Sequence, residues 1–476
     1  MTAAADRPAA RRTLAVVIRV GALLLASGAA TDEVERAMQR IARASGLSSV
    51  LAIVQFGTIS VSYDPGPEAE PITLIRVARS TMTDYARLAA ASDLERRLSH
   101  SRMTVEEALA EIERIEGTGD PYPGWITWLA AAISAGGATV LFGGGVAEAA
   151  AASIATFAAR PVLDWLTRRG LPTFFRNVAG PAIAVIVVLA LVLLGVPALA
   201  PVAVTGAIVI FLPGAALTAG MRDLIDGSIV SGSARLAEAL LLGAAAAIGA
   251  NIGLQAADLF GPTVELGLPP LEGFSILVQA IAAAIACAAF GIQSGVPVRF
   301  MLSIAIVGAA GLIVDRLALL AGIDAVVATA AAAVMIGAAG RWRARAFRTS
   351  ATIWIGAATL PLLPGRLLVE GLIAAQAGDV APLVGAILIG FAIGIGCALG
   401  DVVIQTIAEI NDTIVQPVVI NPAAGLVEEG LTWISQAARP SERGFGRRRG
   451  GWFGTGLGTS PRVEAQSRGD EGAESD

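Results

Sequence analysis

The chain has 476 residues, of which 55% are hydrophobic and 15% are charged, and its mean hydropathy is +0.70. This composition excludes an ordinary soluble protein and indicates a protein of the lipid bilayer. The net charge of -5 gives no sign of a nucleic-acid partner, and two cysteines with a single histidine support neither a disulfide framework nor a histidine-ligated metal, so we expect no cofactor.

The first apolar run, residues 14–30, follows Arg11 and Arg12 and resembles a secretory signal. Arg19 interrupts this run, and its leucines and valines recur at helical spacing. We therefore expect an amphipathic helix that is retained in the mature protein and packs on a soluble domain.

Dense charge over residues 1–123 indicates that soluble domain. Helical patterns cover 33–44 and 82–98, and Thr104 with Glu107 forms the capping box of a further helix. Between the first two helices lie β-like runs at 50–55, 58–63 and 72–77. The pattern predicts a small α/β domain in the cytosol, without a phosphate-binding loop or a nucleophile elbow.

From Trp125 onward, apolar segments long enough to cross a bilayer dominate the chain. The fold class is therefore a polytopic α-helical membrane protein with an N-terminal α/β domain. The ten expected spans are 125–143, 146–165, 178–198, 201–221, 235–255, 273–292, 299–318, 321–339, 351–374 and 380–404.

Arginines gather in alternate loops between these spans, so the positive-inside rule predicts that both termini are cytoplasmic. Five spans lie in a first membrane half, 124–260, and five in a second, 261–415. Because five is odd, the halves would have opposite orientations and form an inverted repeat. The remaining residues, 416–476, are rich in Gly, Ser and charge and are expected to be a largely disordered cytosolic tail.

Two Pro-Gly pairs interrupt the fourth and ninth spans, Pro213-Gly214 and Pro364-Gly365. A proline disrupts the bond to the carbonyl four residues back, which should free the carbonyls of Val209 and Leu360. Broken helices at corresponding places in two halves are typical of transporter binding sites. The alternative is that both pairs are kinks that serve only helix packing.

A helix that restarts after a break offers N–H groups to a carboxylate, and a glycine lets a ligand approach the backbone. Thr218 lies about one turn beyond Gly214 and suits a substrate hydroxyl. Glu370 could take an ammonium group, although an intrahelical pair with Arg366 is an equal alternative. The candidate substrate-binding residues are Pro213, Gly214, Thr218, Pro364, Gly365 and Glu370.

Carboxylates within or beside the spans are the candidates for proton coupling, because the membrane part contains no histidine. Glu148 and Asp226 are the leading carriers, followed by Asp223 and Asp401. The competing interpretation gives each a structural place: interfacial water for Glu148, a solvated turn for Asp223 and Asp226, and a helix end for Asp401.

Three segments resemble the bacterial threonine/serine exporter family: Gly21–Val34, Ile72–Val77 and the stretch Leu212-Pro-Gly through Arg235. Leu363-Pro-Gly365 resembles the companion domain of the same family. The resemblance implies export of threonine and serine across the bacterial cytoplasmic membrane, driven by the proton motive force, with small amino acids, protons and the lipid bilayer as partners.

Two other functions remain open on the sequence, a membrane sensor or receptor and a channel, each with a cytosolic ligand-binding domain. An intramembrane aspartyl protease is disfavoured, because Gly400-Asp401 has no second aspartate motif in any span. The sequence does not decide whether the protein forms a homo-oligomer.

Overall fold

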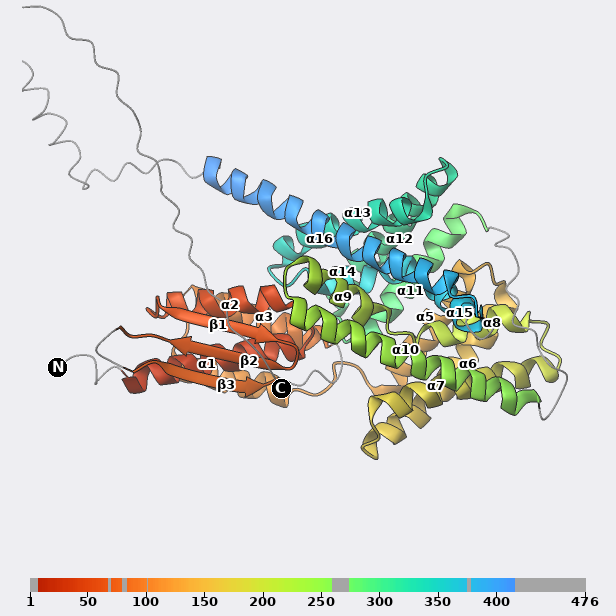
Figure 1. Ribbon diagram of the computed structural model, residues 1–476, viewed down its shortest axis with the longest axis horizontal. Helices are drawn as coiled ribbons and strands as arrows, with labels where there is room; N and C mark the ends of the chain where they lie inside the picture. The colour runs from red at the N-terminus through yellow and green to blue at the C-terminus, as the bar shows by residue number, and fades with distance from the viewer. Residues whose placement is uncertain are drawn as a thin grey trace, which may run out of the picture. The chain divides into compact units, whose positions relative to one another are not determined.

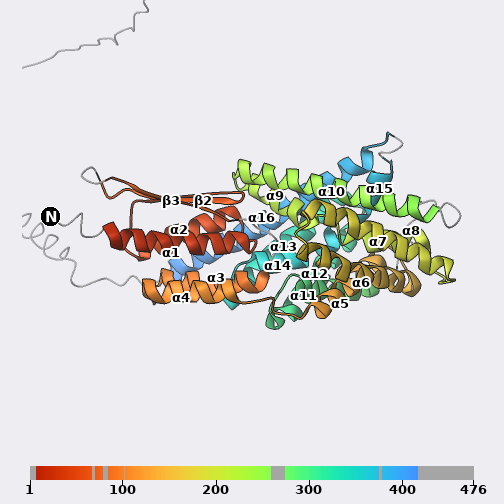
Figure 2. The ribbon, with the colours of Figure 1, turned by 90° about the horizontal axis from the view of Figure 1, so that it is seen from below.

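The computed structural model describes residues 7–66, 70–78, 84–100, 102–258, 274–374 and 378–415. Most of the acidic loop between the two membrane halves and the whole expected tail lie outside these residues. Four helices and three strands form the N-terminal domain (Figures 1 and 2): α1 (Arg7–Ala26), α2 (Thr31–Ala44), β1 (Val50–Gln55), β2 (Thr58–Tyr63), β3 (Ile72–Val77), α3 (Tyr85–Ser99) and α4 (Val105–Gly117).

The three strands form one antiparallel sheet in the order β1-β2-β3. Alternate residues, such as Ala52 and Val54 on β1 and Ile59 and Val61 on β2, are buried against the helices that cover one face of the sheet (Figure 2). The signal-like segment is helix α1, which is buried along its apolar side. The packing expected for this segment is therefore confirmed.

Arg19, the residue that interrupts the apolar run, sits at the edge of this packed helix. Its guanidinium Nη2 donates to Oε2 of Glu116 at 2.8 Å. The capping box of α4 is also present, since the Glu107 amide donates to Thr104 Oγ1 and the Thr104 amide donates to Glu107 Oε2.

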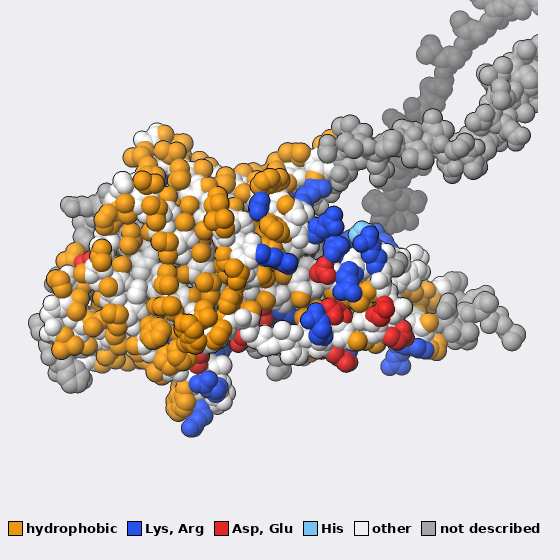
Figure 3. All heavy atoms as spheres, turned by 180° about the vertical axis from the view of Figure 1, so that it is seen from behind, with side chains coloured by type: hydrophobic (Ala, Val, Ile, Leu, Met, Phe, Trp, Pro, Cys, Tyr) orange, Lys and Arg blue, Asp and Glu red, His pale blue; other side chains and the backbone are white. Residues whose placement is uncertain are grey.

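The membrane part contains eight helices that are long and apolar enough to span a bilayer in the described residues, and nine spans if the bent pair α14 and α15 counts as one. Exposed apolar side chains such as Leu277, Leu302 and Ile306 coat these helices, and Figure 3 shows the charged side chains gathered mainly over the N-terminal domain.

The membrane elements follow the same order in each half: three long helices, a broken pair and a long final helix. The first half comprises α5 (Gly124–Leu141), α6 (Val146–Arg168), α7 (Thr173–Leu193), α8 (Ala200–Val209), α9 (Gly214–Ile225) and α10 (Ile229–Asp258). The second half comprises α11 (Ile276–Gln293), α12 (Val298–Leu320), α13 (Ala325–Phe347), α14 (Thr352–Ala358), the 3-10 turn η1 (Leu360–Leu362), α15 (Gly365–Ala374) and α16 (Ala381–Val415).

The expected span 201–221 is thus two short helices, α8 and α9, instead of one continuous helix. The expected span 351–374 is likewise divided, and its two parts are bent by 42°. The count of about ten spans therefore agrees with the structure only when both broken pairs are counted as single spans.

The two halves meet along their first helices, α5 and α11. A Cβ added at Gly137 would lie 2.8 Å from Cβ of Ala286, so the absence of a side chain at Gly137 permits this close approach. The adjacent Ser134 hydroxyl donates to the Ala286 carbonyl at 3.4 Å. The first helices of the two halves are therefore packed closely against each other at this point.

Candidate substrate site and charge network

The two Pro-Gly breaks lie against each other in a reciprocal arrangement. A Cβ added at Gly214 would lie 2.7 Å from Cδ1 of Leu363, next to the second break. A Cβ added at Gly365 would overlap Cγ2 of Val209, at the end of the helix before the first break. Each glycine is therefore packed against the opposite half, which explains why both breaks need a residue without a side chain.

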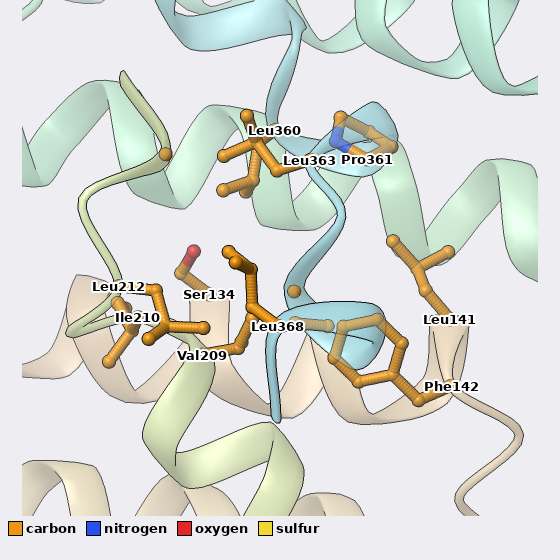
Figure 4. A pocket seen from close by; sticks show the side chains of 13 residues that line it. Ser134, Leu141, Phe142, Val209, Ile210, Leu212, Leu360, Pro361, Leu363 and Leu368 are labelled. Carbon is orange, nitrogen blue, oxygen red and sulfur yellow. The ribbon is translucent and has the colours of Figure 1, made fainter. Parts of the chain in front are cut away.

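A small cavity of about 40 Å³ lies between the breaks (Figure 4). Leucines and other apolar side chains from both halves line it, and Ser134 of α5 contributes the only side-chain hydroxyl among the lining residues. A water molecule needs roughly 10–15 Å³ of such volume, so the cavity has room for a few waters but not for an amino acid. The breaks are therefore closed around the cavity in this conformation.

The carbonyls expected to be free both accept hydrogen bonds, which corrects the sequence prediction. The Leu212 amide donates to the Val209 carbonyl at 3.1 Å, and the Leu363 amide donates to the Leu360 carbonyl at 3.2 Å. The chain tightens into a turn before each proline, so the disrupted helical bonds are replaced locally. Asn177 of α7 adds support, because its Nδ2 donates to the Phe211 carbonyl at 3.1 Å.

A second and much larger cavity, of about 720 Å³, is lined by residues of both the membrane helices and the N-terminal domain. We call it the vestibule. Pro213 lines the vestibule, whereas the next residue, Gly214, lines the small cavity, so one break borders both spaces. Thr218 also faces the vestibule and not the small cavity. The N-terminal domain forms its other wall, with Phe56, Val77 and Tyr85 among the lining residues.

A charge network beside the vestibule joins three helices from both halves. Asp401 of α16 is 3% exposed and accepts from Arg222 Nη2 at 2.6 Å and from Arg341 Nη2 at 2.7 Å. Arg222 also lies 3.6 Å from Asp226, measured from Nε to Oδ2. Asp401 is thus not a helix end in water; it is a buried carboxylate between two guanidinium groups.

Asp223 is the second buried carboxylate of this region and is 2% exposed. Arg235 Nε lies 2.9 Å from its Oδ2, as expected from the sequence, but Asp223 itself is not solvated, whereas Asp226 in the same turn is exposed. Thr31, at the start of α2 in the N-terminal domain, donates its hydroxyl to Asp223 Oδ2 at 3.3 Å. The domain therefore contacts the membrane charges directly.

Glu33, two residues further along α2, extends this contact. Its Oε2 accepts from the Ser350 hydroxyl at 2.9 Å and from the Thr352 hydroxyl at 3.4 Å. Burial raises the pKa of Glu33 above its usual value, although the Ser350 hydrogen bond and the charges of Arg222 and Arg341 act in the opposite direction. The start of α2 is thus hydrogen-bonded to both membrane halves.

The other predicted residues are not part of this group. Glu148 lies at the start of α6, where its Oε1 accepts from the Leu199 amide at 2.8 Å. Figures 1 and 2 place α8, which follows Leu199, at the end of the helical part away from the N-terminal domain. Glu370 accepts from Arg366 Nε at 2.7 Å, which is the intrahelical pair that spacing had offered as an alternative.

Sequence reasoning missed Arg341, Asn177 and Ser134 as residues of the site, and it missed Thr31 as a contact to the membrane part. Arg341 was visible only as one of several arginines that set the topology. Ser134 was visible only as a small residue for helix packing. No spacing rule links Thr31 to Asp223, because 192 residues separate them.

Comparison with known proteins agrees with this architecture. The family described as "Putative threonine/serine exporter" matches residues 15–257, and the family described as "Threonine/Serine exporter, ThrE" matches residues 279–407. The chain is 29% identical over 404 residues to the "Probable threonine/serine exporter" of Mycobacterium tuberculosis, which covers 82% of this chain and 76% of that protein.

A second relative is the "Threonine/serine exporter" of Corynebacterium glutamicum, 27% identical over 366 residues, with 75% of this chain and 74% of that protein covered. No solved structure matches. The resemblance found in the sequence is thereby confirmed, and the first family match alone spans half of the chain. This protein belongs to the threonine/serine exporter family and is a multi-span membrane transporter, not an enzyme.

Proposed function

We propose that this protein exports threonine and serine from the cytoplasm and that the proton motive force drives the export. The observation that carries the proposal is the pair of breaks that meet at the seam between the halves, with a large vestibule on one side. The names of the relatives support the substrates. The substrate-binding residues we propose at the breaks are Pro213, Gly214, Pro364 and Gly365, with Thr218 toward the vestibule and Glu370 behind the second break.

The closed cavity implies that the two halves must separate locally for an amino acid to pass. The matching order of elements in the halves supports an inverted repeat, in which one arrangement opens toward the vestibule and the other toward the opposite side. The first helix turns after each break then supply N–H groups for the substrate carboxylate.

We further propose that Glu148 and Asp226 carry the coupled protons, with Asp223 and Asp401 as secondary candidates. Asp226 is the only one of the four that is not buried, and its ion pair with Arg222 is long, so a proton can reach it from the cytosolic side. Glu148 lies at the other end of the broken helix pair. The two carboxyls thus stand at opposite ends of the proposed path.

Export is tested in proteoliposomes with labelled threonine and serine, with and without an imposed proton gradient. We expect Glu148→Gln and Asp226→Asn to abolish uphill export yet to retain exchange of labelled for unlabelled substrate, because an amide side chain cannot take up and release a proton. Asp324→Asn is the matched control, because asparagine also caps α13. Normal uphill export by both variants would place the coupling residue elsewhere. A sensor would show no exchange at all.

We also propose that both termini are cytoplasmic. The hydrogen bond between Glu33 and Ser350 supports this orientation, because it puts the N-terminal domain on the same side as the arginine-rich C-terminal end of α13. Reporter fusions after Thr349 should read cytoplasmic, and fusions after Gly267 should read extracytoplasmic. The opposite result at both positions would refute the orientation.

A further inference from the structure

The vestibule has features of a binding site that the breaks do not supply. Its volume of about 720 Å³ exceeds that of the cavity between the breaks, and residues of the N-terminal domain and of the membrane helices line it together. Two arginines and two acidic residues line it: Arg222, Asp223, Arg235 and Glu238. Two are positive and two are negative, so the balance suits a ligand that carries one charge of each sign.

Both of these arginines have a donor group without a hydrogen-bond acceptor in the described part of the protein. Nε of Arg235 and Nε of Arg222 are buried, and neither has a hydrogen-bond acceptor among the described residues. Arg235 Nε lies close to Asp223, at 2.9 Å, but this contact is an ion pair without hydrogen-bond alignment. A buried guanidinium N–H without an acceptor is costly, so these two groups are available to an acceptor that enters the vestibule.

We propose that the vestibule is a recognition site for a zwitterionic α-amino acid, in which Arg235 binds the carboxylate and Asp223 binds the ammonium. This inference rests on the proposed export function and names where the substrate is first bound. An α-amino acid has an ammonium and a carboxylate group attached to the same carbon atom. It can therefore replace the direct contact between Asp223 and Arg235 without leaving either charge unpaired. That substitution avoids the large cost of an uncompensated buried charge.

The N-terminal domain takes part in this site. The Arg235 guanidinium lies 5.9 Å from the centre of the Phe56 ring, in the turn between β1 and β2. Thr31 donates to Asp223 from the start of α2. The domain therefore holds both members of the pair from the cytosolic side, which gives it a direct role in substrate recognition.

The geometry also predicts what the vestibule distinguishes. Both the amino and the carboxyl group must be charged, so N-acetylthreonine and threonine amide should bind poorly. The space is large compared with a threonine side chain, so selection by side-chain size must occur later, at the small cavity between the breaks.

The test uses the purified full-length protein in lipid nanodiscs and measures equilibrium binding of labelled threonine. On the wild-type protein, unlabelled threonine should compete, whereas N-acetylthreonine and threonine amide should compete at least about tenfold less well. The charge-balanced double variant D223N/R235Q should lose threonine affinity by about tenfold or more, because both charge-assisted bonds disappear. Arg299→Gln, a change at an exposed arginine that does not line the vestibule, is the control and should bind as the wild type does.

Equal competition by the blocked amino acids, or unchanged affinity in the folded double variant, would overturn the proposal. If the double variant does not fold, Phe56→Ala and Thr31→Val replace it, and unchanged affinity in both has the same meaning. Threonine exchange in proteoliposomes of the wild-type protein and of the vestibule variants distinguishes failure of the vestibule site from failure of the proposed export function. Exchange with an unaltered KM in the vestibule variants refutes this site and leaves the export function standing, whereas binding without any exchange refutes the export function.

Discussion

Gly365→Ala is expected to reduce threonine and serine efflux by about tenfold while the protein still inserts in the membrane. The added Cβ overlaps Cγ2 of Val209, which belongs to the opposite half. Overpacking of this kind costs roughly 1–3 kcal/mol, and the cost falls on the conformation in which the two breaks are closed on each other. Gly214→Ala should have a smaller effect, because the nearest atom, 2.7 Å away, is the end of the flexible Leu363 side chain.

A second change should restore the packing and so identify its cause. Val209→Ala removes Cγ2 and leaves Cβ of residue 209 at 3.4 Å from the new Cβ, which is ordinary van der Waals contact. The double variant should therefore export better than Gly365→Ala alone, a coupling that efflux from cells of matched abundance would measure. Gly243→Ala, where an added Cβ meets nothing within 4 Å, is the control. If the losses of efflux in the two single variants simply add in the double variant, the contact between residues 209 and 365 does not explain the loss of transport.

Local chemistry made the breaks, the strands and the first helix predictable from the sequence. A proline cannot continue a helix, alternation of apolar residues marks a half-buried strand, and Arg19 argues against a signal peptide whatever the surrounding fold. The pair of Arg366 and Glu370 could be predicted too, because four residues in a helix always bring side chains to the same face.

The partners of Asp401 could not be predicted in this way. Arg222 and Arg341 lie 179 and 60 residues before it in the chain, and only the packing of α9 and α13 against α16 brings them to one carboxylate. The sequence shows the charges but not which helices are neighbours, so the helix end in water was an equal alternative. The prediction that two carbonyls are free was wrong for a related reason. The local turn that gives each carbonyl a hydrogen bond is not encoded by the proline alone.

The vestibule was also beyond sequence reasoning, because its wall consists of residues from the N-terminal domain and from both membrane halves. Thr218 could be placed one turn beyond the break, but the side of the helix that faces the small cavity depends on how α9 packs. Asp223 was correctly paired with Arg235 by proximity in the chain, whereas its burial depends on Thr31 and the docking of α2.

Asp401→Asn should be among the most destabilising single substitutions in the membrane part. The change leaves Arg341 without its carboxylate and leaves Arg222 with only the longer contact to Asp226. Removing one partner of a buried ion pair costs about 3–5 kcal/mol, because the remaining charge is uncompensated in a medium of low polarity. We expect this loss of stability to lower the unfolding temperature of the detergent-solubilised protein and to lower the protein's abundance in the membrane.

Charge balance, not the loss of a particular side chain, should account for the effect. The double variant D401N/R341Q removes one negative and one positive charge, and Arg222 keeps Asp226, so it should recover part of the lost stability. Asp324→Asn is the control, since it removes an exposed carboxylate that caps α13 and asparagine caps as well. If Asp401→Asn unfolds at the same temperature as this control, the network contributes no net stability.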